Sequence, residues 1–186
     1  ISNFSEMTSG SKMSDDGNLL LDEKEKLELI SRNPKTENFI KKFIGAHEFL
    51  NGSYRYCIHI TAETKDDAYK IPELAKLFDK VRTFRARSTK EATKKKAIIP
   101  HFFDEDKHQK GDYILVPRHS SENRDYIPLG LLTDETVMGD SAMAIYDAQP
   151  WLFGVIHSKM HMVWVDAVGG KLETRYRYSA KLCYNT

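Results

Sequence analysis

The chain has 186 residues, with 28 Lys and Arg, 27 Asp and Glu, and 40% apolar residues. This length suits one domain of ordinary size that buries a hydrophobic core. Aromatic residues make up 11% of the sequence, which excludes a disordered chain. The apolar runs are too short for a membrane span and no secretory signal is visible, so we expect no membrane partner. Cys57 and Cys183 lie far apart without a metal-binding motif, which excludes a zinc ribbon or disulfide scaffold and favours a reducing cytoplasm.

Charge is distributed unevenly along the chain, although the net charge is only +1. Residues 80–96 hold eight basic residues against Glu91 alone, whereas residues 15–28 hold six acidic residues against two lysines. A one-sided field of this kind steers an anionic partner to one face of the molecule.

The first elements follow from local capping signals. Residues 1–18 are rich in Ser, Asn, Asp and Gly and predict a linker. A helix is predicted from Asp22, with Glu25 as its capping-box partner, until Asn33-Pro34 stops it. A second, short helix is predicted from Thr36 until Gly45.

A strand and a long helix come next. Residues 54–60 are aromatic and β-branched and predict a strand. Pro72 suits the first turn of a helix over residues 72–97, whose apolar residues keep helical spacing. The basic residues occupy its C-terminal half.

The second half of the chain predicts strands at residues 113–116, 126–132 and 142–146. Ser158 can cap a helix with an apolar stripe at Met160, Val163, Trp164 and Ala167. Residues 172–179 alternate like a strand. We therefore predict an α+β domain over residues 19–186, a single domain with a mixed β-sheet and helices packed mainly on one side.

Catalytic motifs are hard to find in this sequence. His157 and His161 share a helical face but lack a third metal ligand, so a packed helix start is the better interpretation. Glu105-x-Lys107 matches only half of a nuclease motif. Ser120 and His119 are adjacent, and catalytic triads assemble from residues distant in sequence. We predict no catalytic or metal-binding residue, although a self-contained nuclease or hydrolase stays an alternative.

The basic half of the long helix is the first candidate for binding. Its density of cations can follow a phosphate backbone, and neighbouring hydroxyl groups support such contacts. A solvated surface helix, or a basic helix that meets an acidic protein surface, explains the composition equally well.

Two further segments concentrate hydrogen-bonding side chains. Residues 117–124 connect two strands, and a loop on a rigid sheet is a common place for recognition groups. In Glu173-x-Arg175-x-Arg177, side chains two apart on a strand stand about 6.6–6.8 Å apart on one face. Glu accepts from cytosine and Arg donates to guanine, so one such pair can read both bases of a C·G pair. Ordinary ion pairs on an exposed sheet are the alternative.

A resemblance to a known family runs along the whole chain. The matching motifs are GSKMSDDGNLL (10–20), FIGAHEF (43–49), VRTFR (81–85), VPRHSSENR (116–124), GDSA (139–142), MHMVW (160–164) and YRYSAK (176–181). In these motifs the chain resembles the target-recognition domain of MmeI-like restriction–modification enzymes, single chains that contain an adenine-specific DNA methyltransferase. The family often has Gly-Gly where this chain has Asp16-Gly17, a change that a linker turn tolerates.

The resemblance implies a domain that binds double-stranded DNA beside the methyltransferase domain of the same chain, in a bacterial or archaeal cytoplasm. S-adenosylmethionine would bind the parent methyltransferase domain, not this segment, and Mg²⁺ would be needed if a nuclease domain is present. Glu173 and Arg175 are implied to read a C·G pair, and Arg118 with Asp140 to form a second base-reading pair. The expected phosphate contacts are Arg82, Arg85, Lys94, Lys95, Ser120, Ser121, Arg124, Lys159 and Arg177.

Overall fold

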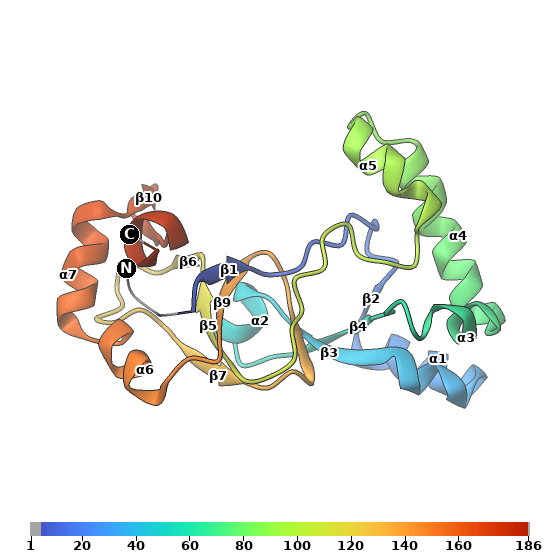
Figure 1. The fold of residues 1–186 in the computed structure, drawn as a ribbon, viewed down its shortest axis with the longest axis horizontal. Coiled ribbons are helices and arrows are strands. Elements are labelled where there is room, and N and C mark those ends of the chain that lie inside the picture. Colours follow the sequence, from blue (N-terminus) through green and yellow to red (C-terminus); the bar gives the residue numbers. More distant parts are fainter. Residues whose placement is uncertain (1–4, 186) are drawn as a thin grey trace. The chain divides into compact units, whose positions relative to one another are not determined.

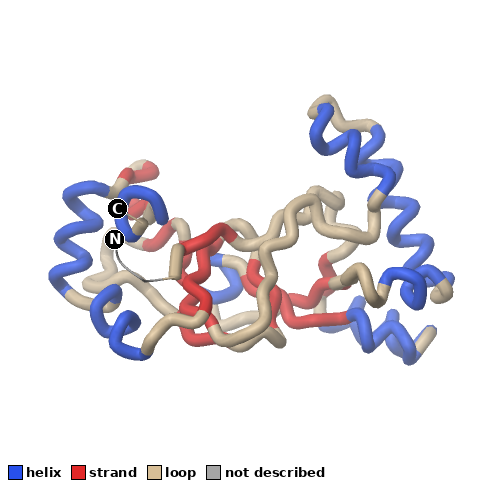
Figure 2. The backbone as a smooth tube through the Cα atoms, viewed as in Figure 1, coloured by secondary structure: helices blue, strands red, loops and turns tan. Residues whose placement is uncertain are grey.

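The structure is a computed structural model that describes residues 5–185. Helices alternate with β-sheets, which confirms the predicted α+β class (Figures 1 and 2). We predicted no internal boundary, but the chain forms two compact units from segments distant in sequence. The first unit comprises Ile1–Gly10, Ile44–Ser53 and Lys107–Thr186, and the second comprises Ser11–Phe43 and Tyr54–Asp106.

A four-stranded antiparallel sheet organises the first unit. Its order is β1 (Met7–Ser9), β9 (Ala142–Tyr146), β5 (Tyr113–Pro117) and β7 (Gly130–Leu132). β9 and β5 agree closely with the predicted strands, whereas β7 is shorter than predicted. Residues 1–18 were predicted as a linker, but β1 pairs with β9 because Met7 is buried opposite Ile145; residues 1–4 lie outside the described part of the chain.

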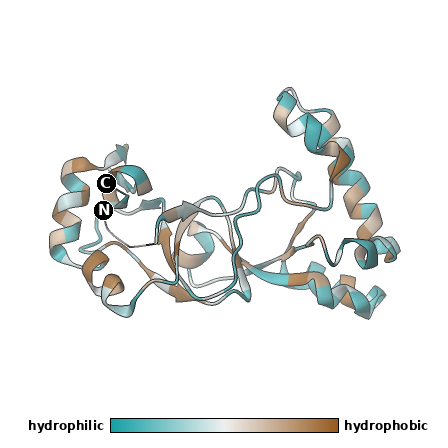
Figure 3. Cartoon of the chain, in the orientation of Figure 1, coloured by the Kyte–Doolittle hydropathy of each residue, from teal (hydrophilic) through white to brown (hydrophobic). Residues whose placement is uncertain are grey.

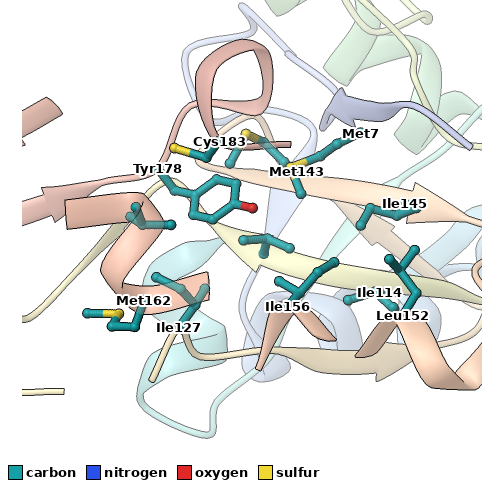
Figure 4. Packing of buried hydrophobic residues seen from close by; sticks show 12 residues of the cluster. Met7, Ile114, Ile127, Met143, Ile145, Leu152, Ile156, Met162, Tyr178 and Cys183 are labelled. Carbon is teal, nitrogen blue, oxygen red and sulfur yellow. The ribbon is translucent and has the colours of Figure 1, made fainter. Parts of the chain in front are cut away.

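Helices cover one face of this sheet. They are α6 (Pro150–Ile156), α7 (Lys159–Val168) and the π-helical turn η3 (Ala180–Tyr184), and Figure 3 shows the apolar residues of α6 and α7 in brown. Figure 4 shows the core that they form with the sheet. This core includes Met7, Ile114, Ile127, Met143, Ile145, Leu152, Ile156, Met162, Tyr178 and Cys183. On the other face, Tyr113 and Leu115 pack with Phe49 of α2 (Ala46–Leu50) and with Met138 of β8 (Thr136–Met138).

The helix predicted after Ser158 is confirmed, and the Ser158 hydroxyl accepts from the His161 N–H at 3.1 Å. The predicted apolar stripe lies on the exposed side of this helix, and the face that enters the core carries Met162 and Val165 instead.

A small three-stranded sheet completes the first unit. β10 (Gly170–Leu172) and β11 (Arg175–Arg177) form a hairpin, and β11 also pairs with β6 (His119–Ser120). The single strand predicted over residues 172–179 is therefore wrong. The chain reverses at Glu173, whose φ of +57° interrupts the extended conformation. The alternation of residue types continues through this turn, so it could not reveal the turn.

The second unit begins as the sequence predicts. α1 (Glu23–Arg32) begins with the predicted capping box, in which the Asp22 carboxylate accepts from the Glu25 N–H at 2.7 Å and the Glu25 carboxylate accepts from the Asp22 N–H at 2.9 Å. Asn33 is the C-cap of α1. The helix predicted from Thr36 to Gly45 is wrong. A 3₁₀ helix, η1 (Pro34–Phe39), leads into β3 (Ile40–Ile44), whose apolar residues pair with β4 (Arg55–Ile58) instead of forming a helical stripe. β2 (Leu20–Leu21) pairs with the other edge of β4.

The predicted long helix is broken into pieces. After α3 (Lys65–Tyr69), Pro72 begins α4 (Pro72–Ala86) as expected, but α4 stops well before residue 97. The Ser88 hydroxyl accepts from the Lys90 N–H at 3.1 Å, a local turn that competes with the helix. α5 (Glu91–Lys95) and η2 (Lys96–Ile98) follow, so the basic run occupies the end of α4, the loop after it, α5 and the first residue of η2.

Arg85 on α4 is a structural residue. It is fully buried, and burial lowers the pKa of its guanidinium. The guanidinium donates five hydrogen bonds of 2.8–3.3 Å to the backbone carbonyls of Met13, Ser14, Lys96, Ile99 and Phe102. The predicted phosphate contact is therefore wrong for Arg85, because its donors are satisfied inside the second unit.

Replacing Arg85 by Met should lower the free energy of unfolding by about 3–5 kcal/mol, because buried carbonyls would lose charged donors. Arg82→Met is the matched control, since Arg82 is exposed and forms an exposed ion pair with Asp79 one turn earlier. We expect Arg82→Met to change stability by less than about 0.5 kcal/mol. Urea denaturation measures both, and equal losses for the two variants would contradict the structural role of Arg85.

Candidate nucleic-acid interface

The pairing of β11 with β6 brings together two segments that sequence analysis selected separately. Tyr176 lies opposite Ser120, and Arg177 lies opposite His119. At the hairpin turn, the Thr174 hydroxyl donates to the Glu122 carboxylate at 2.8 Å. The 117–124 segment and the Glu-x-Arg motif therefore form one surface, which we call the hairpin surface.

Glu173 and Arg175 contact each other directly. The Arg175 Nη2 donates to the Glu173 Oε2 at 2.9 Å, and this hydrogen bond raises the pKa of Arg175. Their side chains are 75% and 54% exposed, respectively. The two residues do not share a strand face as predicted, because Glu173 lies in the turn with a φ of +57° and Arg175 begins β11. The outcome is an exposed acceptor beside an exposed donor.

Arg118 is held by β1 and by the loop that contains Asp140. Its Nε donates to the Asp140 carbonyl at 2.6 Å, and its Nη2 donates to the Ser9 hydroxyl at 2.6 Å. Gly10 makes room for this loop, because a Cβ there would lie 2.1 Å from the Gly139 carbonyl oxygen. The structure thus joins Arg118 to Asp140 through the backbone and leaves Asp140 exposed.

The hairpin surface is electrostatically positive around His119. Burial is the main cause that lowers the pKa of His119, and Arg177, Arg118 and Arg175 lower it further. The pKa of Glu122 is lowered by a hydrogen bond from its own backbone, by the hydrogen bond from the Thr174 hydroxyl, and by the charge of Arg175. Sequence analysis did not select His119, Glu122 or Thr174 as site residues. Their only signal was membership of the polar segments, since the β6–β11 pairing that gathers them is a long-range contact.

The remaining predicted contacts of the first unit have different environments. Ser120 is buried in β6, so the predicted phosphate contact of Ser120 is wrong. The Ser121 hydroxyl accepts from the Asn123 N–H at 3.2 Å and shapes the turn. Arg124 and Arg177 are exposed, and Lys159 is exposed while forming an ion pair with Asp125 at 3.3 Å.

The basic run forms a separate surface on the second unit. Arg82 pairs with Asp79 and Lys94 pairs with Glu91, both one helical turn apart, and Lys95 is exposed. An open hollow on this unit is lined by Asp16, Asn18, Asp79, Lys80, Thr83, Phe84, Arg87, Ser88 and Thr89. Sequence analysis did not select Lys80 and Arg87, although both belong to the basic run that it recognised.

Other motifs take part in packing. The His157 Nδ1 lies 2.8 Å from the Ile127 carbonyl, and the His161 Nε2 lies 2.8 Å from the Tyr178 hydroxyl. Among the described residues, no group of three or more His, Cys, Asp or Glu is placed to hold a metal ion. Within the same residues, no helix has the length and apolarity to cross a membrane.

These features define an α+β domain that presents a basic, hydrogen-bonding surface on a β-hairpin. The sequence model of the family "MmeI, target recognition domain" matches residues 1–186, and the chain belongs to that family.

Two relatives are similar over nearly the whole chain. DNA methyltransferase A of Bacillus subtilis (strain 168) is 40% identical over 187 residues, which cover 100% of this chain and 21% of that protein. The solved structure of the Type IIL restriction–modification enzyme MmeI in complex with DNA is 36% identical, with a TM-score of 0.95, over 99% of this chain and 25% of that chain. The chain thus spans about a quarter or less of the length of these relatives.

Proposed function

We propose that this chain selects the DNA sequence that a restriction–modification methyltransferase modifies at adenine. The observation that carries this proposal is the exposed Glu173–Arg175 pair on the hairpin surface, where Arg118 and Arg177 also lie near His119. Family membership and the likeness to MmeI, whose structure contains DNA, support it.

The hairpin surface suits direct reading of base edges. The DNA major groove admits a two-stranded β-ribbon, and β10 with β11 is such a ribbon. There the Glu173 carboxylate would accept from cytosine N4, while Arg175 would donate to guanine O6 and N7. Arg118 and Asp140 would form the second base-reading pair.

Contacts to the phosphate backbone would set the position of the domain on DNA without reading sequence. Arg124, Arg177, Lys159 and Ser121 would supply them from the first unit. Arg82, Lys94 and Lys95 would supply them from the second unit.

Catalysis belongs to other parts of the parent protein in this proposal. A neighbouring domain would bind S-adenosylmethionine and flip the target adenine out of the duplex, as enzymes that modify bases do. Mg²⁺ would act there only if the parent also contains a nuclease domain. We place the parent enzyme in the bacterial cytoplasm, where its DNA substrate is found.

Exchanging the two signs of the base-reading pair tests the proposal. Glu173→Lys with Arg175→Asp, made in the parent enzyme, retains an ion pair but exchanges donor and acceptor. The preferred base pair should change from C·G to G·C at one position, with a discrimination of about 1–3 kcal/mol, or roughly 5- to 150-fold. Methylation of duplexes that differ at that position measures the change.

Lys171 and Asp166 provide the matched control, because they form another exposed ion pair, at 3.0 Å, that joins β10 of the hairpin to α7. Lys171→Asp with Asp166→Lys should leave sequence preference unaltered. An unaltered preference after the Glu173 and Arg175 exchange, in an enzyme that still methylates, would refute the proposed base-reading role.

The basic run should contribute affinity without specificity. Lys94→Ala and Lys95→Ala, in the parent enzyme, should weaken binding to all sequences alike and lower the salt slope of log K by about 0.9 per lost phosphate contact. Binding titrations at several salt concentrations measure the slope. Lys24→Ala, an exposed change on α1, is the control and should leave the slope unchanged. A loss confined to one sequence would contradict this role.

A further inference from the structure

Helix α7 has apolar residues on two faces, and only one of them is covered. Met162 and Val165 enter the core, while Met160, Val163 and Trp164 are 77%, 66% and 44% exposed. Ala167 is exposed at the next helical position of the same stripe. This i, i+3, i+4, i+7 spacing is the pattern of a helix face that packs against another element.

The exposed stripe continues onto η3. The Trp164 indole N–H donates to the Cys183 carbonyl at 3.2 Å, which fixes the ring beside η3. The residue before Cys183 in η3, Leu182, is 48% exposed. We call Met160, Val163, Trp164, Ala167 and Leu182 the α7 outer face. Burying a large apolar side chain stabilises a contact by about 1.5–3 kcal/mol. An exposed group of such side chains is therefore typical of a surface that binds a partner.

We propose that another part of the parent chain packs on the α7 outer face and thereby fixes the first unit to the rest of the enzyme. This inference rests on the proposed function, in which the domain serves a larger protein. None of the five residues of the face is charged, so it offers DNA phosphates no cation. It suits an apolar protein surface instead.

The two ends of the described chain lie beside this face. The Asn185 side chain accepts from the Met7 N–H at 3.0 Å and donates to the Met7 carbonyl at 3.1 Å. η3 packs against both β1 and α7. In relatives four to five times longer than this segment, which covers 21% and 25% of them, flanking chain would therefore attach next to the α7 outer face.

Methionine oxidation provides a direct test. The sequence has six methionines, all within the described residues, and Met160 alone is exposed while the other five are buried. Oxidation by peroxide follows solvent access. In the wild-type parent enzyme without DNA, the oxidation rate of Met160 should be lower than in the urea-unfolded protein by a factor of roughly ten or more. The buried Met162 should show a similar reduction in its oxidation rate. Peptide mass spectrometry measures both rates.

Variants identify the covering surface. Val163→Gln should loosen the contact and speed Met160 oxidation several-fold in the parent enzyme. Leu131→Gln is the control, because Leu131 is as exposed, at 68%, but lies on β7. It should leave Met160 protected.

Three results would overturn the proposal. They are fast oxidation of Met160 in the folded parent enzyme, protection that disappears on dilution, and protection that requires added DNA. The second would indicate another copy of the chain, and the third would indicate DNA as the occupant. The Glu173 and Arg175 exchange tests the proposed function separately, because it reports base preference and does not depend on Met160.

Discussion

The pairing of β11 with β6 is the constraint on which the hairpin surface depends. Without it, the polar 117–124 segment and the Glu-x-Arg motif would be two unrelated exposed stretches. With it, Arg177 lies opposite His119, and the Thr174–Glu122 hydrogen bond holds the turn against the neighbouring segment. β11 and β6 pair over only two residues each, so side-chain contacts of this kind contribute much of the stability of the pairing. The groups that would read bases are thus placed by the small sheet, whose strand β6 follows β5 of the larger sheet one residue later along the chain.

The two kinds of arginine in this chain show how burial separates structure from recognition. Arg85 donates to five buried carbonyls and cannot leave them without a large cost in free energy. Arg175 shares an exposed ion pair with Glu173, and exposed pairs contribute little to stability. Exchanging that ion pair for hydrogen bonds to a base pair therefore costs the fold little. The exposed pair suits a surface whose specificity changes while its fold is retained.

Sequence reasoning succeeded where local signals decide the structure. The capping box at Asp22, the proline that begins α4 and the uniformly apolar β9 each depend on residues within a few positions. It failed where distant partners decide, as at β1, which is a strand only because β9 lies beside it, and at β3, which β4 draws into a sheet. The basic run likewise could not show that Arg85 points inward. The two segments of the hairpin surface could be identified from the sequence, but the pairing of β11 with β6 that brings them together could not.

The apolar stripe of α7 differs from these cases, because the pattern is present but the face that carries it is exposed. Its spacing predicts a covered face, yet within the described residues the chain covers the other side of the helix. An apolar face with helical spacing is typical of a helix that packs against another element, so the stripe is consistent with the proposed contact to another part of the parent chain. The same segment has its described ends held together by Asn185 and Met7, beside that stripe. In the proposed arrangement, a surface of the parent chain on the α7 outer face would leave the hairpin surface free for DNA, and this would account for apolar residues on both faces of α7.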